Sequence, residues 1–477
     1  MKDDMPASNP AIDRETVPSK ESPGLAERLL KVFTDVKPGE AGTALLLTLN
    51  VYLLLMAYYF IKPVREALVL SAKGPLVRSS LAGAQAILFI FVVKGFSRLA
   101  SKVARQRLIT WVTLFFISNL VLFYFFKVWG MPEGTRAIAF FIWVGIFNIM
   151  TVAQFWSFAN DLYTEEAGKR LFPLIAVGMT FGAFSGSSIA NFIIKPLGRQ
   201  FDSIMMLMTA GVLGLCIILT NVIHGREIRR IKERSLKTGA DLSREEKAKE
   251  QPLSTGGGFR LIFKSRYLLY YALLLLLLNY VNYMGENIWG LAVKQAAVKA
   301  IETGTSGGLS QPQFVAVMTA DYQSLYNLIA LILQLFLVSR IFKWTGIRGA
   351  LLVLPFVALG GYGLIATGAS LILIKWVKVF ENGLDYSLMN TTKGALFLVT
   401  SREEKYKGKA AADTFFYRTG DALAAAMFVV GWTVFGFTAE RLALINVAFT
   451  LVWILLCFLL IRQYRKIKER GTAAAGT

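Results

Sequence analysis

The fold is indicated most clearly by residues 375–421, which read KWVKVFENGLDYSLMNTTKGALFLVTSREEKYKGKAAADTFFYRTGD. The stretch begins as an apolar run and then collects charged residues, which are costly inside a bilayer unless they face water or one another. On a helix, spacings of three and four residues give one polar face, made of Lys375, Lys378, Asn382, Asp385, Met389 and Lys393. This pattern predicts a helix that forms one wall of a polar route through a membrane protein.

The composition extends this interpretation to the whole chain. Of the 477 residues, 55% are hydrophobic and only 17% are charged, and the mean hydropathy is +0.51, which is well outside the range of a soluble domain. Apolar runs recur throughout the chain, and its length suits about twelve spans of roughly 20 residues. We therefore predict an all-α membrane protein with twelve transmembrane helices in two six-helix halves.

The two halves are predicted at residues 41–224 and 260–462, separated by a basic linker at 225–259. Residues 1–40 are expected to form a tail, with a short helix that lies either on the membrane surface or in water, and residues 463–477 a second tail. The segments TEEAGKRLFPLI and SREEKYKGKAAAD, after the predicted fourth and tenth spans, resemble each other weakly. Such internal repetition is typical of transporters built from two similar halves.

The formal net charge of +21 is explained by topology rather than by nucleic acid, because the basic residues gather in alternate loops. The linker and both termini are therefore expected on the cytoplasmic side of the membrane. Cys216 and Cys457 lie in apolar spans and His224 is the single histidine. This usage predicts no disulfide framework, no histidine metal site, no cofactor and no enzyme activity.

Two further polar faces are candidates for a binding site. The predicted seventh span is rich in leucine but carries one polar stripe, made of Asn279, Asn282, Tyr283, Glu286 and Gly290. Such a stripe lines a cavity or bonds neighbouring helices, and the ionisable Glu286 favours the cavity. In the first span, Tyr58, Lys62 and Arg65 share a face. After residue 410 a further helix places Asp413, Phe416, Tyr417, Gly420 and Asp421 on one side.

Several motifs resemble the nucleotide transporter family, the ATP/ADP exchangers of plastids and intracellular bacteria that are distant relatives of the major facilitator superfamily. The resemblance covers nearly all of the chain and is carried by ENGLDYSLMNTTKGALFL (381–398), EEKYKGKAAADTFFYRTGD (403–421), FWSFANDLY (155–163) and GENIWGLAVK (285–294). It implies a major-facilitator-like fold. It also implies substrate-binding roles for a set of residues that comprises Arg65, Glu66, Glu286, Trp289 and Lys393.

Two departures from the family pattern are visible. The segment FIWVGIFN (141–148) has no acidic residue where the family usually carries one, and Arg65 stands where the family has a lysine. An arginine side chain favours two-pronged pairing with phosphate or carboxylate groups.

We therefore predict a transporter that exchanges nucleotides or related phosphorylated anions by alternating access. The expected substrate site comprises Lys62, Arg65, Glu66, Asn282, Tyr283, Glu286, Trp289, Asp385 and Lys393. Its partners are a small anionic substrate, the nucleotide, and the lipid bilayer, with no nucleic acid, and we expect a monomer. Two alternatives stay open. One is a proton-coupled solute carrier or exporter in which Glu286 and Asp385 titrate. The other is a membrane partner or sensor that transports nothing.

Overall fold

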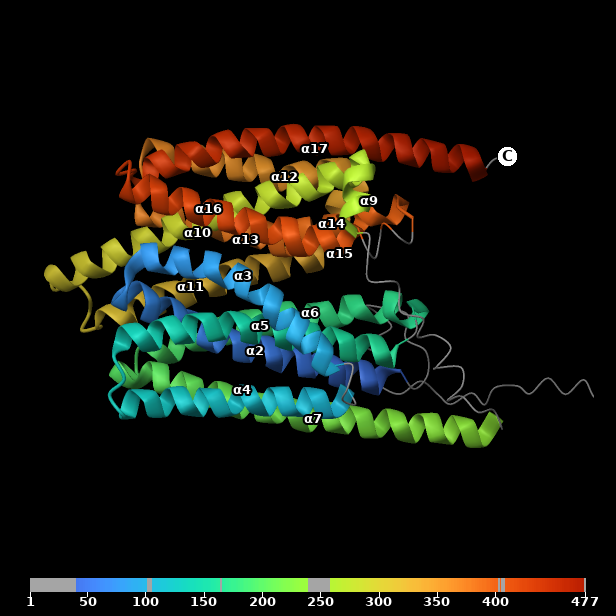
Figure 1. Cartoon of the computed structure of the whole chain (residues 1–477), viewed down its shortest axis with the longest axis horizontal. Helices are drawn as coiled ribbons and strands as arrows, with labels where there is room; N and C mark the ends of the chain where they lie inside the picture. The colour runs from blue at the N-terminus through green and yellow to red at the C-terminus, as the bar shows by residue number, and fades with distance from the viewer. Residues whose placement is uncertain are drawn as a thin grey trace, which may run out of the picture.

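The computed structural model describes residues 40–100, 105–163, 165–238, 258–401, 404 and 408–475. Within these residues every regular element is a helix, and the helices form two bundles stacked against each other (Figure 1). The predicted surface or solvated helix of the N-terminal tail, the middle of the predicted linker and the last two residues lie outside the described part of the chain.

The N-terminal bundle consists of long helices joined by short turns. In chain order they are α2 (Ala41–Ala72), α3 (Gly74–Ala100), α4 (Arg105–Val128), α5 (Glu133–Leu162), α6 (Glu165–Ile194), the short η1 (Gly198–Gln200) and α7 (Phe201–Thr238). Helix α7 extends well past residue 225, so the first part of the predicted linker continues the sixth span as a helix.

The C-terminal bundle contains more interruptions. Its elements are α9 (Gly258–Lys264), α10 (Arg266–Glu302), α11 (Gln311–Ile332), η2 (Leu333–Leu337), α12 (Val338–Thr367), α13 (Leu371–Leu384), η3 (Asp385–Met389), α14 (Asn390–Leu396), η4 (Phe397–Val399), α15 (Lys409–Ala411), η6 (Ala412–Phe416), α16 (Tyr417–Thr433) and α17 (Ala439–Ala475). Three of them, η2, η3 and η6, are π-helical turns, a form frequent at functional sites. Gly346 has a φ of 64° inside α12 and breaks that helix in two.

Eight helical stretches in the described residues are long and apolar enough to cross a membrane. One of them, Gln311–Thr367, runs through the break in α12 and is long enough for two spans. Helix α3 and the predicted tenth and eleventh spans are not among the eight, and the tenth carries several charges. The chain is thus a helical, multi-pass membrane protein, while the count of twelve crossings stays a prediction.

The bundles meet mainly through three helix pairs. Helix α6 packs against α11, α2 also packs against α11, and α3 packs against α16. At the first interface Ser188 and Ser324 share a hydrogen bond of 2.7 Å, and Thr180 donates one of 2.9 Å to Gln334. These contacts hold the two halves side by side along a seam on which the central site lies.

Helix α6 also packs very closely on α2 through a row of small residues. A Cβ atom placed on Gly178, Gly182 or Gly186 would lie 2.2–2.8 Å from the backbone carbonyl oxygens of Thr48, Tyr52 and Met56 on α2. No side chain larger than a hydrogen atom fits at these positions, which is the packing role that the four-residue spacing predicts.

The end of α7, the short α9 and the C-terminal end of α17 lie at one end of the molecule, at the right in Figure 1. The turns between α2 and α3 and between α10 and α11 lie at the other end. Both flanks of the predicted linker and the C-terminus therefore share one end of the bundle, as an even number of crossings per half requires.

Candidate functional site

A central cavity of about 230 Å³ lies between the two bundles. Helices of both halves contribute to its wall, chiefly α2, α3 and α5 on one side and α10, α11, η3 and α16 on the other. Eight of the nine residues predicted for the substrate site line it: Lys62, Arg65, Glu66, Asn282, Tyr283, Glu286, Trp289 and Asp385. The ninth, Lys393 on α14, is not part of the wall, and its Nζ lies 3.9 Å from Oδ1 of Asp385.

The N-terminal half presents a group of four charged side chains that we call the cationic cluster: Lys62, Arg65 and Glu66 on α2 and Arg78 on α3. Glu66 accepts hydrogen bonds from both arginines, at 2.5 Å from Nη2 of Arg65 and 2.5 Å from Nε of Arg78. Two guanidinium groups therefore share one carboxylate. Both oxygens of Glu66 accept bonds from these guanidinium groups, and within the described part of the chain no other carboxylate forms an ion pair with either arginine.

Lys62 adds a further positive charge to this cluster. Its Nζ donates a hydrogen bond of 2.8 Å to the hydroxyl group of Tyr326 on α11 and lies 4.8 Å from the ring centre of Tyr59. Among the described residues no carboxylate lies within 4 Å of it. With Lys62, Arg65 and Arg78 against Glu66 alone, the cationic cluster carries a formal charge of +2.

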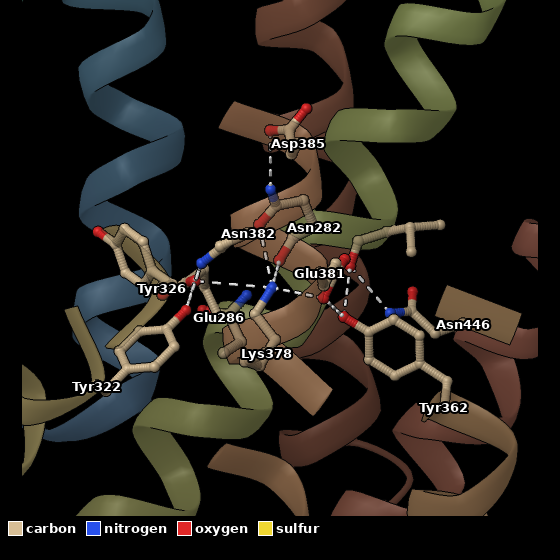
Figure 2. A network of polar contacts seen from close by, with 12 residues as sticks. Asn282, Glu286, Tyr322, Tyr326, Tyr362, Lys378, Glu381, Asn382, Asp385 and Asn446 are labelled. Carbon is tan, nitrogen blue, oxygen red and sulfur yellow. Dashed lines mark hydrogen bonds and ion pairs between the residues drawn. The ribbon is translucent and has the colours of Figure 1, made fainter. Parts of the chain in front are cut away.

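The C-terminal half presents the opposite imbalance in three residues that we call the acidic group: Glu286 on α10 with Lys378 and Glu381 on α13 (Figure 2). Nζ of Lys378 lies 2.8 Å from Glu381 and 3.6 Å from Glu286. Lys378 is 0% exposed and Glu381 is 2% exposed. One ammonium group thus serves two carboxylates, and the formal charge of the acidic group is −1.

Neutral partners complete the coordination of the acidic group, as the dashed lines of Figure 2 show. The hydroxyl group of Tyr322 donates to Glu286 at 2.6 Å, and that of Tyr362 donates to Glu381 at 2.6 Å. Asn382 donates to Glu286 at 2.9 Å. A Cβ on Gly285 would lie 1.9 Å from the Tyr362 hydroxyl oxygen, so this glycine lets α10 approach the group.

The remaining charged residues of the cavity region are paired within their own half. Asp385 faces Lys393 and also lies 3.5 Å from the amide nitrogen of Asn282. Arg418 on α16 pairs with Asp421 at 3.1 Å and covers the ring of Phe89 at 5.0 Å. These pairs add no net charge, so the imbalance of each half comes from the cationic cluster and the acidic group.

Several buried polar atoms around the cavity have no hydrogen-bond partner in the described structure. They include the hydroxyl group of Tyr283 and the side-chain oxygen of Gln323, which both line the cavity, and the amide nitrogen of the neighbouring Asn287. Unpaired buried polar atoms are costly. Their presence along this wall is typical of a surface that receives a polar ligand.

Three aromatic residues of the wall, with Tyr326 between them, form a ladder within the C-terminal half. Ring centres lie 4.8 Å apart for Trp289 and Tyr322, 5.0 Å for Tyr322 and Tyr326, and 5.5 Å for Tyr326 and Tyr386. Trp289 comes from α10, the next two from α11, and Tyr386 from η3. Flat apolar faces therefore lie close to the charged groups.

Sequence reasoning missed three charged residues at or beside this site: Arg78, Glu381 and Arg418. Arg78 comes before the apolar run of α3, a helix that begins at Gly74, so hydropathy did not mark it. The available signal was a charged residue three positions after Pro75. Lys378 was expected on the cavity face, but it is fully buried and does not line the cavity.

Comparison with known proteins gives matches to membrane transporters. A family model described as TLC ATP/ADP transporter matches residues 138–464. ADP,ATP carrier protein 4 of Rickettsia felis is 25% identical over 307 residues, which cover 57% of this chain and 56% of that protein. ADP,ATP carrier protein 2 of Chlamydia pneumoniae is 23% identical over 384 residues, which cover 70% and 69%. The match to the first of these spans little more than half of the relative's length.

Solved structures share the fold. The nucleoside transporter NupG superposes with a TM-score of 0.59 at 12% identity, covering 88% of this chain and 99% of its own. A peptide transporter, POT, in complex with sulfate gives 0.58 at 12% identity, covering 93% and 99%. At this identity the similarity shows the fold alone, and it confirms the predicted major-facilitator-like architecture.

Proposed function

Because the chain belongs to the TLC ATP/ADP transporter family, we propose that it exchanges ATP, ADP or closely related nucleotides across the membrane by alternating access. The substrate binds in the central cavity, between the two halves. The protein lies in the inner membrane of a bacterium, with both termini and the linker between the halves in the cytoplasm.

The observation that carries this proposal is the surplus positive charge of the cationic cluster. A nucleotide brings several negative charges, and moving them out of water is prohibitive without fixed cations. Arg65 and Arg78 offer guanidinium groups suited to phosphate oxygens, and Lys62 is bound by neutral oxygen and aromatic rings alone within the described residues. A phosphate chain supplies the anion that this cluster lacks.

The other wall residues take complementary roles. Trp289 and Tyr322 present flat faces on which a nucleobase stacks, a contact worth about 1–3 kcal/mol per base. Tyr283, Asn282 and Glu286 bond the polar edges of the nucleoside. Lys393, from the opposite half, completes the anion site when it turns from Asp385 toward phosphate, and Asp385 then accepts hydrogen bonds from the polar groups of the nucleoside.

Alternating access follows from the arrangement of the two bundles. The cavity lies at the boundary between the halves, as expected for a transporter whose halves rock about a central site. Helix pairs α6–α11, α2–α11 and α3–α16 form the seam. Most of the substrate cations come from the N-terminal half, while the aromatic wall comes mainly from the C-terminal half. Nucleotide binding thereby links the halves.

Uptake into proteoliposomes tests the proposal. Vesicles loaded with ADP should take up labelled ATP rapidly, and empty vesicles should take up little, because an exchanger needs substrate on both sides. Lys62→Ala should remove most of this uptake, while Lys73→Ala, at the end of the bundle, should leave it unchanged. Uptake into empty vesicles driven by a pH gradient alone would favour the proton-coupled carrier. Failure to bind any nucleotide would favour a membrane partner or sensor.

A further inference from the structure

The acidic group has one carboxylate more than its lysine can neutralise. Two neighbouring carboxylates of the C-terminal half have cations of their own: Asp321 pairs with Lys375, and Asp385 faces Lys393. Glu286 and Glu381 share Lys378. A buried charge without a partner costs several kcal/mol or more, and such a group usually binds a proton instead.

The N-terminal half carries the charge that can balance this excess. Glu286 lines the same cavity as Lys62, Arg65 and Arg78, so the surplus positive charge of the N-terminal half compensates it across the cavity. Lys378 then remains with Glu381, to which it is closer. When an anion binds the cationic cluster, this compensation is lost, and Glu286 faces both an anion and a second carboxylate.

We propose that the acidic group binds one proton from water together with the anion, and that Glu381 is the carboxylate that receives it. The inference rests on the proposed function, since the nucleotide is the anion that triggers it. The proton adds to a Glu381 oxygen to form a carboxylic acid. Lys378 keeps all of its protons and shifts its ion pair from Glu381 to Glu286, so the group becomes neutral.

The surroundings of Glu381 suit this exchange of partners. Lys378 faces it from its own helix, Glu286 lies beyond that lysine on α10, and Tyr362 donates to it from α12. From α17, Asn446 bonds the carbonyl oxygen of Val281. None of the described neighbours is a second cation for Glu381, so a proton is what replaces Lys378.

The lysine has a short path between its two carboxylates. Its Nζ lies 3.1 Å from the amide oxygen and 3.2 Å from the carbonyl oxygen of Asn282, which hold the ammonium group while its ion pair changes. The amide oxygen of Asn382, buried beside Glu286, has no partner in the described structure. It is an acceptor available when the hydrogen bonds of the group rearrange.

Calorimetry of ADP binding to the purified protein in two buffers of different ionisation enthalpy counts the protons taken up. Wild-type protein should take up about one proton more per bound ADP than Glu381→Gln, and the protons of ADP itself cancel in this difference. Asp321→Asn, which alters an ion pair outside the acidic group, should match the wild type. An equal proton count in the wild type and Glu381→Gln overturns the inference while leaving nucleotide binding intact.

Two further results would distinguish an error in the Glu381 assignment from a failure of the proposed function. If Glu286→Gln loses the proton and Glu381→Gln keeps it, the assignment to Glu381 is wrong. If equilibrium binding of labelled ADP to wild-type protein is absent, the proposed function fails and the coupled proton fails with it. Infrared difference spectra of the wild type need no variant: ADP should produce the C=O band of a protonated carboxylic acid, and its absence overturns the inference.

Discussion

The cationic cluster and the acidic group border one cavity from opposite halves, and their charges are unbalanced in opposite directions. In the cluster, two arginines share Glu66 and Lys62 contacts only neutral groups among the described residues. In the acidic group, two glutamates share Lys378. A buried site that is short of an anion favours phosphate, and one that is short of a cation favours a proton. The halves of this fold are therefore built alike but have different chemistry.

Removing Lys378 should have the largest effect. Lys378→Met leaves Glu286 and Glu381 buried without a cation, and we expect the free energy of unfolding to fall by about 3–5 kcal/mol. The loss should be smaller at low pH, because protonated carboxyl groups need no counter-ion. Denaturant unfolding in detergent at two pH values measures both effects. Lys375→Met, which breaks a more exposed pair, is the control; equal losses in the two variants would remove the distinction between a buried and a partly exposed pair.

Removing Glu66 should have the next largest effect. Glu66→Ala leaves the guanidinium groups of Arg65 and Arg78 without their carboxylate, at a cost of about 3 kcal/mol. ATP should restore part of this stability, because its phosphates replace the missing anion, and the ATP-induced rise in Tm should exceed that of the wild type. Lys378→Met should show no such excess. If ATP stabilises both variants equally, the two sites do not differ in the ligand they favour.

The third prediction concerns the cations of the proposed phosphate site. Arg65→Ala and Lys393→Ala should each weaken nucleotide binding by about 1–2 kcal/mol, the scale of a hydrogen bond to a charged group. Arg65→Lys should recover part of the loss, because the charge remains but the two-pronged geometry does not. Equilibrium binding to purified protein measures these affinities. If both alanine variants bind nucleotide with wild-type affinity, residues other than Arg65 and Lys393 bind the phosphate groups.

The smallest effect is expected at the ion pair of Asp321 and Lys375. Both side chains are partly exposed, and pairs in contact with solvent contribute about 0–1 kcal/mol. Asp321→Asn should therefore shift Tm only slightly and leave exchange intact. A loss of exchange in this variant would show that the Asp321–Lys375 pair is needed for transport together with the acidic group.

Hydropathy and helical spacing predicted many of the membrane-spanning helices and their polar faces, because a bilayer requires spans that are helical and mostly apolar. The Leu-rich run of α10 was recognised as a span, and the stripe with Asn282, Tyr283 and Glu286 faces the cavity because helical phase is fixed over an unbroken helix. Helical spacing also predicted the cavity face of α2 correctly. Lys62 and Arg65 both line the cavity, although Pro63 lies inside the helix.

The tenth span shows where this reasoning stops. The prediction placed Asp385, Met389 and Lys393 on one continuous face, but η3 is a π-helical turn that begins at Asp385. An additional residue per turn rotates everything that follows, so Met389 is fully buried and Tyr386 lines the cavity instead. Lys378 and Glu381 are three residues apart on α13, so helical spacing could have shown their pairing. The approach of Tyr362 and Glu286 from other helices could not be read from the order of residues in one helix.

The glycine row of α6 has a mechanical consequence. Because Gly178, Gly182 and Gly186 press against the α2 backbone, the two helices cannot rotate or slide independently without a steric clash. Helix α2 carries Lys62, Arg65 and Glu66, while α6 borders α11 of the other half. The two helices therefore move as one unit. A movement of α6 at the seam also moves the charged residues of α2 that we assign to the substrate site. Spin labels on α2 and α6 should keep a constant separation when nucleotide binds, whereas labels on α2 and α12 should move relative to each other.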